Sequence, residues 1–147
     1  MSVGTFRDLT VYKKAFAFAM DVFTISKKFP SEKKYSLTDQ VRRSSRSVCS
    51  CIGEAYRKRQ YKAHFVSKTS DADMENTETR VWLDFALACN YLGNDDWKNF
   101  DEKAEESWKT LKSHDRESRK VLTKDEIGRN VLSIDFLPIV NLLIKTF

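Results

Sequence analysis

The stretch that decides the fold is Ser36–Arg59, SLTDQVRRSSRSVCSCIGEAYRKR, which has the pattern of one long helix with two unlike faces. Small and apolar residues recur along it at three- and four-residue steps, the spacing of a helix face that packs on a core. They are Val41, Ser44, Ser45, Val48, Ile52, Ala55 and Tyr56. The other faces carry Arg42, Arg43, Arg46, Arg57, Lys58 and Arg59 against only Asp39 and Glu54. The stretch therefore predicts a close-packed bundle with a surface that attracts anions.

Length and composition limit what surrounds this helix. With 147 residues the chain fits one domain, and its 4 glycines and 2 prolines favour long helices over a turn-rich fold. The net charge of +5 favours an anionic partner. The 3 cysteines have no metal-site spacing, so we expect a cytoplasmic protein with reduced thiols and neither metal nor cofactor. The N-terminus lacks the apolar core of a signal peptide, and no apolar run reaches the length of about 18 residues that spans a membrane.

Hydrophobic periodicity predicts four helices, at about residues 9–28, 37–59, 62–92 and 95–117. Pro30 follows the first, and Gly93 is expected to end the third in a left-handed conformation. The predicted fold is all-α, an up-down antiparallel four-helix bundle over residues 1–120. Residues 121–147 form a C-terminal extension whose apolar part, 131–147, is equally compatible with an oligomer contact and with packing on its own subunit.

A polar layer is expected between the second and third helices. If they fold back around Gln60–Tyr61, residues whose numbers sum to about 121 lie at the same height. Arg43 then lies level with Glu78, and Arg46 with Glu75. We expect Arg–Glu pairs there, with hydrogen bonds from Ser or Thr such as Ser47, and such a layer sets helix register more than it adds stability. The alternative is a set of solvated surface charges.

The candidate nucleic-acid site is the positive charge along the second helix and in the turn that follows it. Positive charge there can bind phosphates without sequence selectivity, and aromatic side chains nearby can stack on exposed bases. The predicted phosphate-binding residues are Arg42, Arg57, Lys58, Arg59 and Lys62, and the predicted stacking residues are Tyr56 and Tyr61, with His64 beside them. The alternative is a solvated helix face that pairs with the acidic third and fourth helices.

A catalytic function finds little support in the sequence. His64 and His114 stand in no metal-binding pattern, and no glycine-rich phosphate loop exists. Cys51 and His64 can approach each other across the turn between the second and third helices, but buried inert cysteines are far more common than catalytic ones. We therefore expect no catalytic residue.

Three segments resemble the four helix bundle family, also called 23S rRNA intervening-sequence proteins, over about residues 6–120. They are FRDLTVYKKA, FVSKTSDADMENTETRVWLDFALACNYL and LTDQVRRSSRSVCSCIGEAYRKR. The last is similar to the family pattern Q-x-R-R-x-x-x-S-x-x-x-N-I-A-E-G-x-x-R and departs from it at Cys51, Gly53 and Ala55, where Asn, Ala and Gly are usual. Its matching positions are Gln40, Arg42, Arg43, Ser47, Ile52, Glu54 and Arg57.

The resemblance implies a four-helix bundle that assembles into rings, typically homopentamers. A related accessory protein of diversity-generating retroelements binds nucleic acid together with a reverse transcriptase. From residues and resemblance together, we expect a non-catalytic homo-oligomer that binds RNA or DNA or scaffolds a nucleic-acid enzyme such as a reverse transcriptase. The alternative is a self-associating protein whose partner is another protein. A ring would multiply a weak basic patch by avidity.

Overall fold

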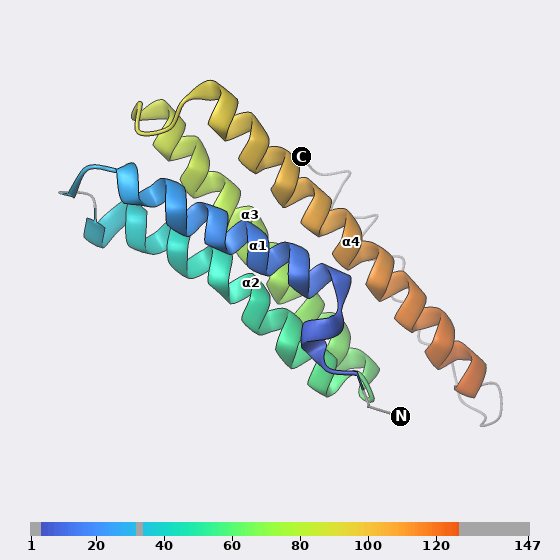
Figure 1. The fold of residues 1–147 in the computed structure, drawn as a ribbon. Helices are drawn as coiled ribbons and strands as arrows, with labels where there is room; N and C mark the ends of the chain where they lie inside the picture. The colour runs from blue at the N-terminus through green and yellow to red at the C-terminus, as the bar shows by residue number, and fades with distance from the viewer. Residues whose placement is uncertain (1–3, 32–33, 127–147) are drawn as a thin grey trace, which may run out of the picture.

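Four long helices make up the fold (Figure 1), as the computed structural model shows for residues 4–31 and 34–126, the part of the chain that it describes. A short turn η1 (Phe6–Asp8) precedes α1 (Thr10–Ile25), which continues into the turn η2 (Ser26–Lys28). A π-helical turn η4 (Lys34–Thr38) leads into α2 (Asp39–Lys58), and α3 (Lys62–Ala88) and α4 (Asn94–Glu126) follow. The all-α bundle predicted from periodicity is thus confirmed.

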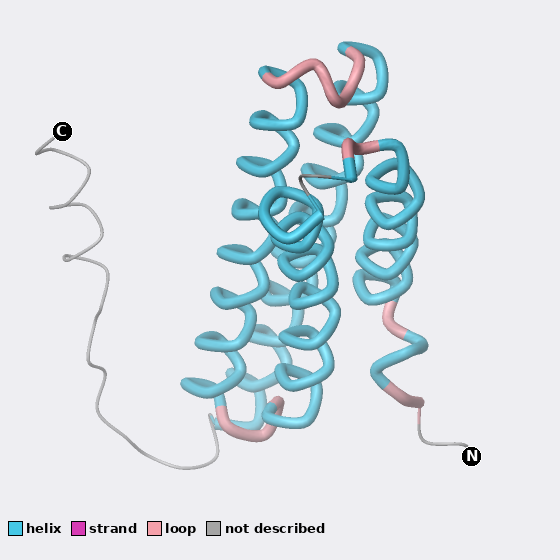
Figure 2. The backbone as a smooth tube through the Cα atoms, turned by 90° about the vertical axis from the view of Figure 1, so that its left-hand side faces the viewer, coloured by secondary structure: helices cyan, strands magenta, loops and turns pink. Residues whose placement is uncertain are grey.

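The turns lie at the two ends of the bundle, as Figure 2 shows. The α2–α3 turn lies at the same end as η1, and the α3–α4 turn lies at the other end. α1 and α3 each pack on both α2 and α4, which places α1 and α3 diagonally across the bundle. α4 runs to Glu126 and so passes the domain boundary predicted near residue 120. The apolar segment 131–147 lies outside the described residues.

Small residues let α2 and α3 pack closely. On α2 the buried positions include Ser44, Ser45 and Ala55, which are small as the sequence predicted. On α3 the buried positions alternate at steps of four and three, which keeps one stripe facing the core. They are Phe65, Thr69, Ala72, Asn76, Thr79, Leu83 and Ala86. The core-facing side of the middle of α3 is therefore filled by compact side chains, most of them polar.

Those polar side chains have hydrogen-bond partners inside the bundle. Thr79 Oγ1 lies 2.9 Å from Ser44 Oγ and also donates to the Glu75 carbonyl (2.8 Å), both within one buried layer. Asn76 Nδ2 donates to the Ala104 carbonyl on α4 (3.2 Å). A buried hydroxyl or amide costs free energy unless it is paired, so these contacts fix the register of α3 against its neighbours.

Ion pairs attach α4 to the rest of the bundle. Arg80 on α3 binds Asp101 (2.7 Å) and Glu105 (3.1 Å), and Lys14 on α1 binds Glu106 (2.7 Å). All of these side chains remain partly exposed, so each pair adds little to the free energy of unfolding. The pairs select the orientation of α4 between α1 and α3.

The end of α3 corrects one sequence prediction. Asn90, not Gly93, adopts the left-handed conformation, with φ of 59°. The Tyr91 N–H donates to the Ala86 carbonyl (2.8 Å) and the Asn90 N–H to the Leu87 carbonyl (2.9 Å), the two bonds of a Schellman motif. Asn tolerates this conformation better than other side-chain-bearing residues, so the helix ends before the glycine is reached.

Candidate nucleic-acid interface

Four of the predicted phosphate-binding cations lie together at the α2–α3 turn. Arg57 and Lys58 occupy the last turn of α2, Arg59 caps it, and Lys62 begins α3. The Tyr61 N–H donates to the Lys58 carbonyl (2.8 Å), which keeps the turn short. These four residues are called the basic turn below. A short turn between two helices concentrates their charge at one end of the bundle.

No carboxylate of the described residues pairs with any cation of the basic turn. The acid closest to it along α2, Glu54, is bound by Lys68 Nζ (2.8 Å), which also contacts Asp71 (3.1 Å). Those two hydrogen bonds raise the pKa of Lys68 above its ordinary value. Among the described residues, the positive charge of the basic turn is therefore not neutralised by an ion pair.

Arg42 does not belong to this cluster. Its Nε donates to Ser26 Oγ (2.7 Å), and its Cζ lies 4.9 Å from the centre of the Phe23 ring. It stands fifteen positions before Arg57 on the same helix, a separation of about 22 Å at 1.5 Å per residue. The sequence analysis predicted Arg42 as a phosphate-binding residue in addition to the cations at 57–62, and the structure places it toward the other end of α2.

The two predicted stacking residues have different surroundings. The Tyr56 hydroxyl donates to the Gly4 carbonyl, and Arg59 Cζ lies 4.1 Å from the centre of the Tyr56 ring. That ring face is therefore already covered. Tyr61 is 64% exposed, and its ring meets His64 edge-on with centroids 6.1 Å apart. Of the two tyrosines, Tyr61 is the one open to a base.

Sequence reasoning missed two aromatic residues beside the basic turn. Phe6 of η1 and Tyr12 of α1 meet edge-on, with ring centroids 5.0 Å apart, and Arg7 Cζ lies 4.6 Å from the centre of the Phe6 ring. Both rings line an open groove of about 470 Å³ that also contains Arg57 and Lys58. Phe6 and Tyr12 lie more than forty residues before Arg57 and Lys58 in the sequence, so no local pattern links the two rings to the two cations.

The polar layer between α2 and α3 forms around Arg43. Arg43 Nη2 contacts the Glu78 carboxylate, as the height argument predicted, and Nη1 lies 3.8 Å from Glu75. Arg46 does not reach Glu75, because its Nε donates to the Arg42 carbonyl one turn back (2.8 Å). Ser47 is partly buried next to them. The layer thus centres on one arginine rather than two.

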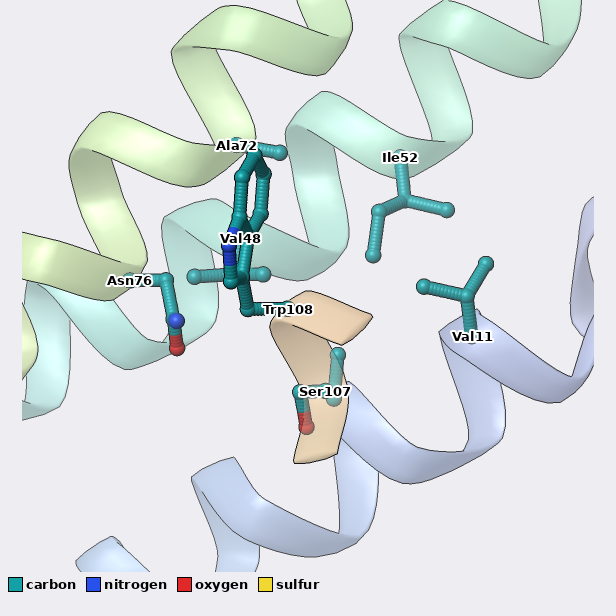
Figure 3. A pocket seen from close by; sticks show the side chains of 8 residues that line it. Val11, Val48, Ile52, Ala72, Asn76, Ser107 and Trp108 are labelled. Carbon is teal, nitrogen blue, oxygen red and sulfur yellow. The ribbon is translucent and has the colours of Figure 1, made fainter. Parts of the chain in front are cut away.

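The cavities found between the described helices are too small for a ligand. A cavity of about 10 Å³ lies between the helices and is lined by residues of all four (Figure 3). That volume corresponds to about one water molecule. Asn76 and Ser107 are the polar residues at its wall, and Asn76 Oδ1 has no hydrogen-bond partner. The larger hollows of the described part are the open grooves on its surface.

A catalytic or metal site finds no geometric support within the described residues. No group of three potential metal ligands occurs there, and no hydrogen bond joins His64 to a cysteine. Burial raises the pKa of the Cys51 thiol, so it stays in the unreactive protonated form. Among the described helices, none is long and apolar enough to cross a membrane.

These features define a class, the helical bundles with an exposed basic end. A family profile described as 23S rRNA-intervening sequence protein matches residues 7–113, and the chain belongs to this family. The chain is also similar to a crystal structure of a protein of unknown function from the S23 ribosomal protein family of Bacteroides thetaiotaomicron. The TM-score is 0.67 and the identity 27%, over 75% of this chain and 98% of the other. No curated protein matches the chain.

Proposed function

We propose that this protein binds nucleic acid through the basic turn and catalyses no reaction. The observation that carries the proposal is the group of Arg57, Lys58, Arg59 and Lys62, none of which pairs with a carboxylate in the described part. Cations that bind phosphate release counterions from the nucleic acid, which supplies affinity without sequence choice. The same surface suits a scaffold for an enzyme that works on nucleic acid, such as a reverse transcriptase.

The test is a titration of labelled single-stranded RNA, structured RNA and duplex DNA at several salt concentrations. Replacing Arg57 and Lys58 by Gln removes two phosphate contacts, so the slope of log K against log salt should fall by about 1.4 for single strands. The matched control is Lys27→Gln with Lys28→Gln, two exposed cations of η2, which follows the C-terminal end of α1. Equal losses in both double variants would mean that binding follows net charge rather than the basic turn.

The second candidate is self-association, supported by two exposed apolar stripes. The α1 stripe consists of Phe16, Met20 and Phe23, and the α3 stripe of Met74, Val81 and Phe85. Phe16 is 51% exposed and Phe85 53%, and exposed apolar patches of this kind commonly mark interaction surfaces. We propose a homo-oligomer, and the family resemblance makes a ring of five the expected size.

The two stripes have surroundings of opposite charge. Lys27 Nζ lies 4.6 Å from the Phe23 ring centre, and Arg42 covers the same ring. The α3 stripe borders a groove of about 780 Å³ that contains Asp71, Asp73, Glu75 and Glu78 besides Lys68. Complementary charge suits a contact between the α1 stripe of one copy and the α3 stripe of the next. Light scattering at micromolar concentration tests this contact, and a monomer would contradict it.

A further inference from the structure

The groove between η1 and α2 combines an aromatic floor with a cationic wall. Phe6 and Tyr12 supply the rings, and Arg57 and Lys58 lie along α2 at the same groove. Its volume of about 470 Å³ lies within the range of small-molecule sites, roughly 300–1,000 Å³. The groove opens directly beside the basic turn, so a nucleic-acid strand bound at that turn passes the mouth of the groove.

Gly53 makes room for an occupant. The Cβ of any other residue at position 53 would lie 3.7 Å from Phe6 Cδ2, an ordinary contact distance, and its further atoms would extend into the groove. Gly53 lies within α2 and has no positive φ, so its backbone does not require glycine. The absence of a side chain there serves space rather than backbone conformation.

The charge of the groove is positive. Glu54 is its only acidic lining residue among those described, and Lys68 neutralises that carboxylate (2.8 Å). Burial raises the pKa of Cys49, another lining residue, to about 11, so its thiol adds no negative charge at neutral pH. Arg57 and Lys58 are left to set the sign of the potential at the groove mouth.

A nucleotide matches these walls better than an anion without a planar ring does. Bases present a flat apolar face to aromatic rings, and each is joined to a phosphate that can reach a neighbouring cation. Only unstacked bases of single strands, loops or bulges are free to enter, since those of a duplex are stacked and paired. Arg7 lies over one face of the Phe6 ring, and Phe16 stacks on Tyr12 with ring centroids 6.1 Å apart, so a base in the groove meets the remaining ring surfaces that line it.

We infer that this groove takes an unpaired nucleobase of a single-stranded RNA or DNA segment, whose flanking phosphates bind Arg57 and Lys58. The inference rests on the proposed function and deepens it, because it makes the protein selective for single-stranded segments. Binding at the basic turn alone would be equally compatible with duplexes.

The experiment compares three fluorescent probes on the full chain by anisotropy: a short single-stranded RNA, the same strand with abasic sugars at its centre, and the matching duplex. The variants are Gly53→Leu, which fills the groove without changing charge, and Gly53→Ala as its control. We expect Gly53→Leu to weaken single-strand binding about tenfold, the effect of losing one stacked base. Gly53→Ala and duplex binding should change less than about twofold, below one stacked base.

Three other outcomes are distinguishable. If wild type binds the single strand and Gly53→Leu binds it equally well, the groove holds no base, whereas the proposed function stands. If the abasic strand binds as tightly as the intact one, the inference also fails, and this comparison needs no variant to fold. If wild type binds none of the probes, the proposed function fails and the inference with it. Thermal unfolding by circular dichroism confirms that each variant is folded.

Discussion

The three cysteines have unlike surroundings, which determine how each can react. Cys89 caps α3 and is exposed, whereas Cys49 and Cys51 are partly buried on α2. Burial raises the pKa of Cys49 to about 11, and it raises that of Cys51 as well. The thiolate is the reactive form, so a raised pKa slows alkylation at neutral pH.

We predict that Cys89 is alkylated much faster than Cys49 at pH 8. With a pKa of about 11, only about one Cys49 thiol in a thousand is ionised at that pH. The rate at Cys49 should rise as the pH approaches 11. Iodoacetamide labelling followed by peptide mass spectrometry measures each site separately, and a Cys89→Ser variant serves as the control that retains only the slow sites. Equal rates at Cys49 and Cys89 in folded protein would contradict the prediction.

Glu75 belongs to the polar layer, but its carboxylate is incompletely paired there. Its Oε2 is buried without a hydrogen-bond partner, and Arg43 Nη1 is 3.8 Å from Oε1. Burial raises the pKa of Glu75, and the charge of Glu78 adds to the rise, while Arg43 opposes it without cancelling it. The folded protein therefore binds a proton here more tightly than the unfolded chain does.

We predict that Glu75→Gln gains stability relative to wild type as the pH rises from 4.5 to 7. A carboxyl whose folded pKa lies above its unfolded value disfavours folding once it is ionised, and this effect vanishes as the pH falls through the folded pKa. Urea unfolding across this range measures the difference. The control is Glu102→Gln, an exposed carboxyl on α4. A difference that stays constant with pH would show that Glu75 titrates alike in both states.

At the scale of whole elements, sequence periodicity located all four helices because each carries a core stripe along the part whose side chains the structure describes. The ends were harder, because they depend on single backbone conformations. The residue that ends α3 was predicted as Gly93 from its type, yet Asn90 reaches the left-handed region first. The π-helical turn η4 likewise has no hydrophobic signature. For the candidate site, local charge located the basic turn, but Phe6 and Tyr12 required the packing of η1 on α2.

The end of α3 gives a prediction at this scale. Asn90→Ala should lower the free energy of unfolding by about 1 kcal/mol, because a Cβ-bearing residue without a short polar side chain is strained at φ of 59°. Gly93→Ala should be nearly neutral, since a Cβ there meets no atom within 4 Å and no glycine described here has positive φ. Chemical denaturation measures both. A larger loss of stability for Gly93→Ala than for Asn90→Ala would contradict the prediction and indicate that Gly93 ends α3.

On the scale of the whole molecule, the α1 stripe and the α3 stripe lie on opposite sides of α2. α1 and α3 lie diagonally in the bundle, each packed between α2 and α4 (Figure 1). One contact with a single copy therefore cannot cover both stripes. A contact between unlike surfaces leaves one stripe of each kind open for the next copy, and repetition then gives a closed ring or a filament. A contact between two like stripes would stop at a dimer.

Two variants separate these assemblies. Met20→Glu adds a negative charge to the α1 stripe, and Phe85→Lys adds a positive charge to the α3 stripe, in each case opposite to the sign that prevails nearby and equal to the sign that it would face across the contact. If unlike stripes meet, each variant alone should be a monomer by light scattering. Their mixture should form heterodimers, because the intact α3 stripe of the first still fits the intact α1 stripe of the second. A dimer of Phe85→Lys alone would instead show that two α1 stripes meet, since that variant keeps only its α1 stripe intact.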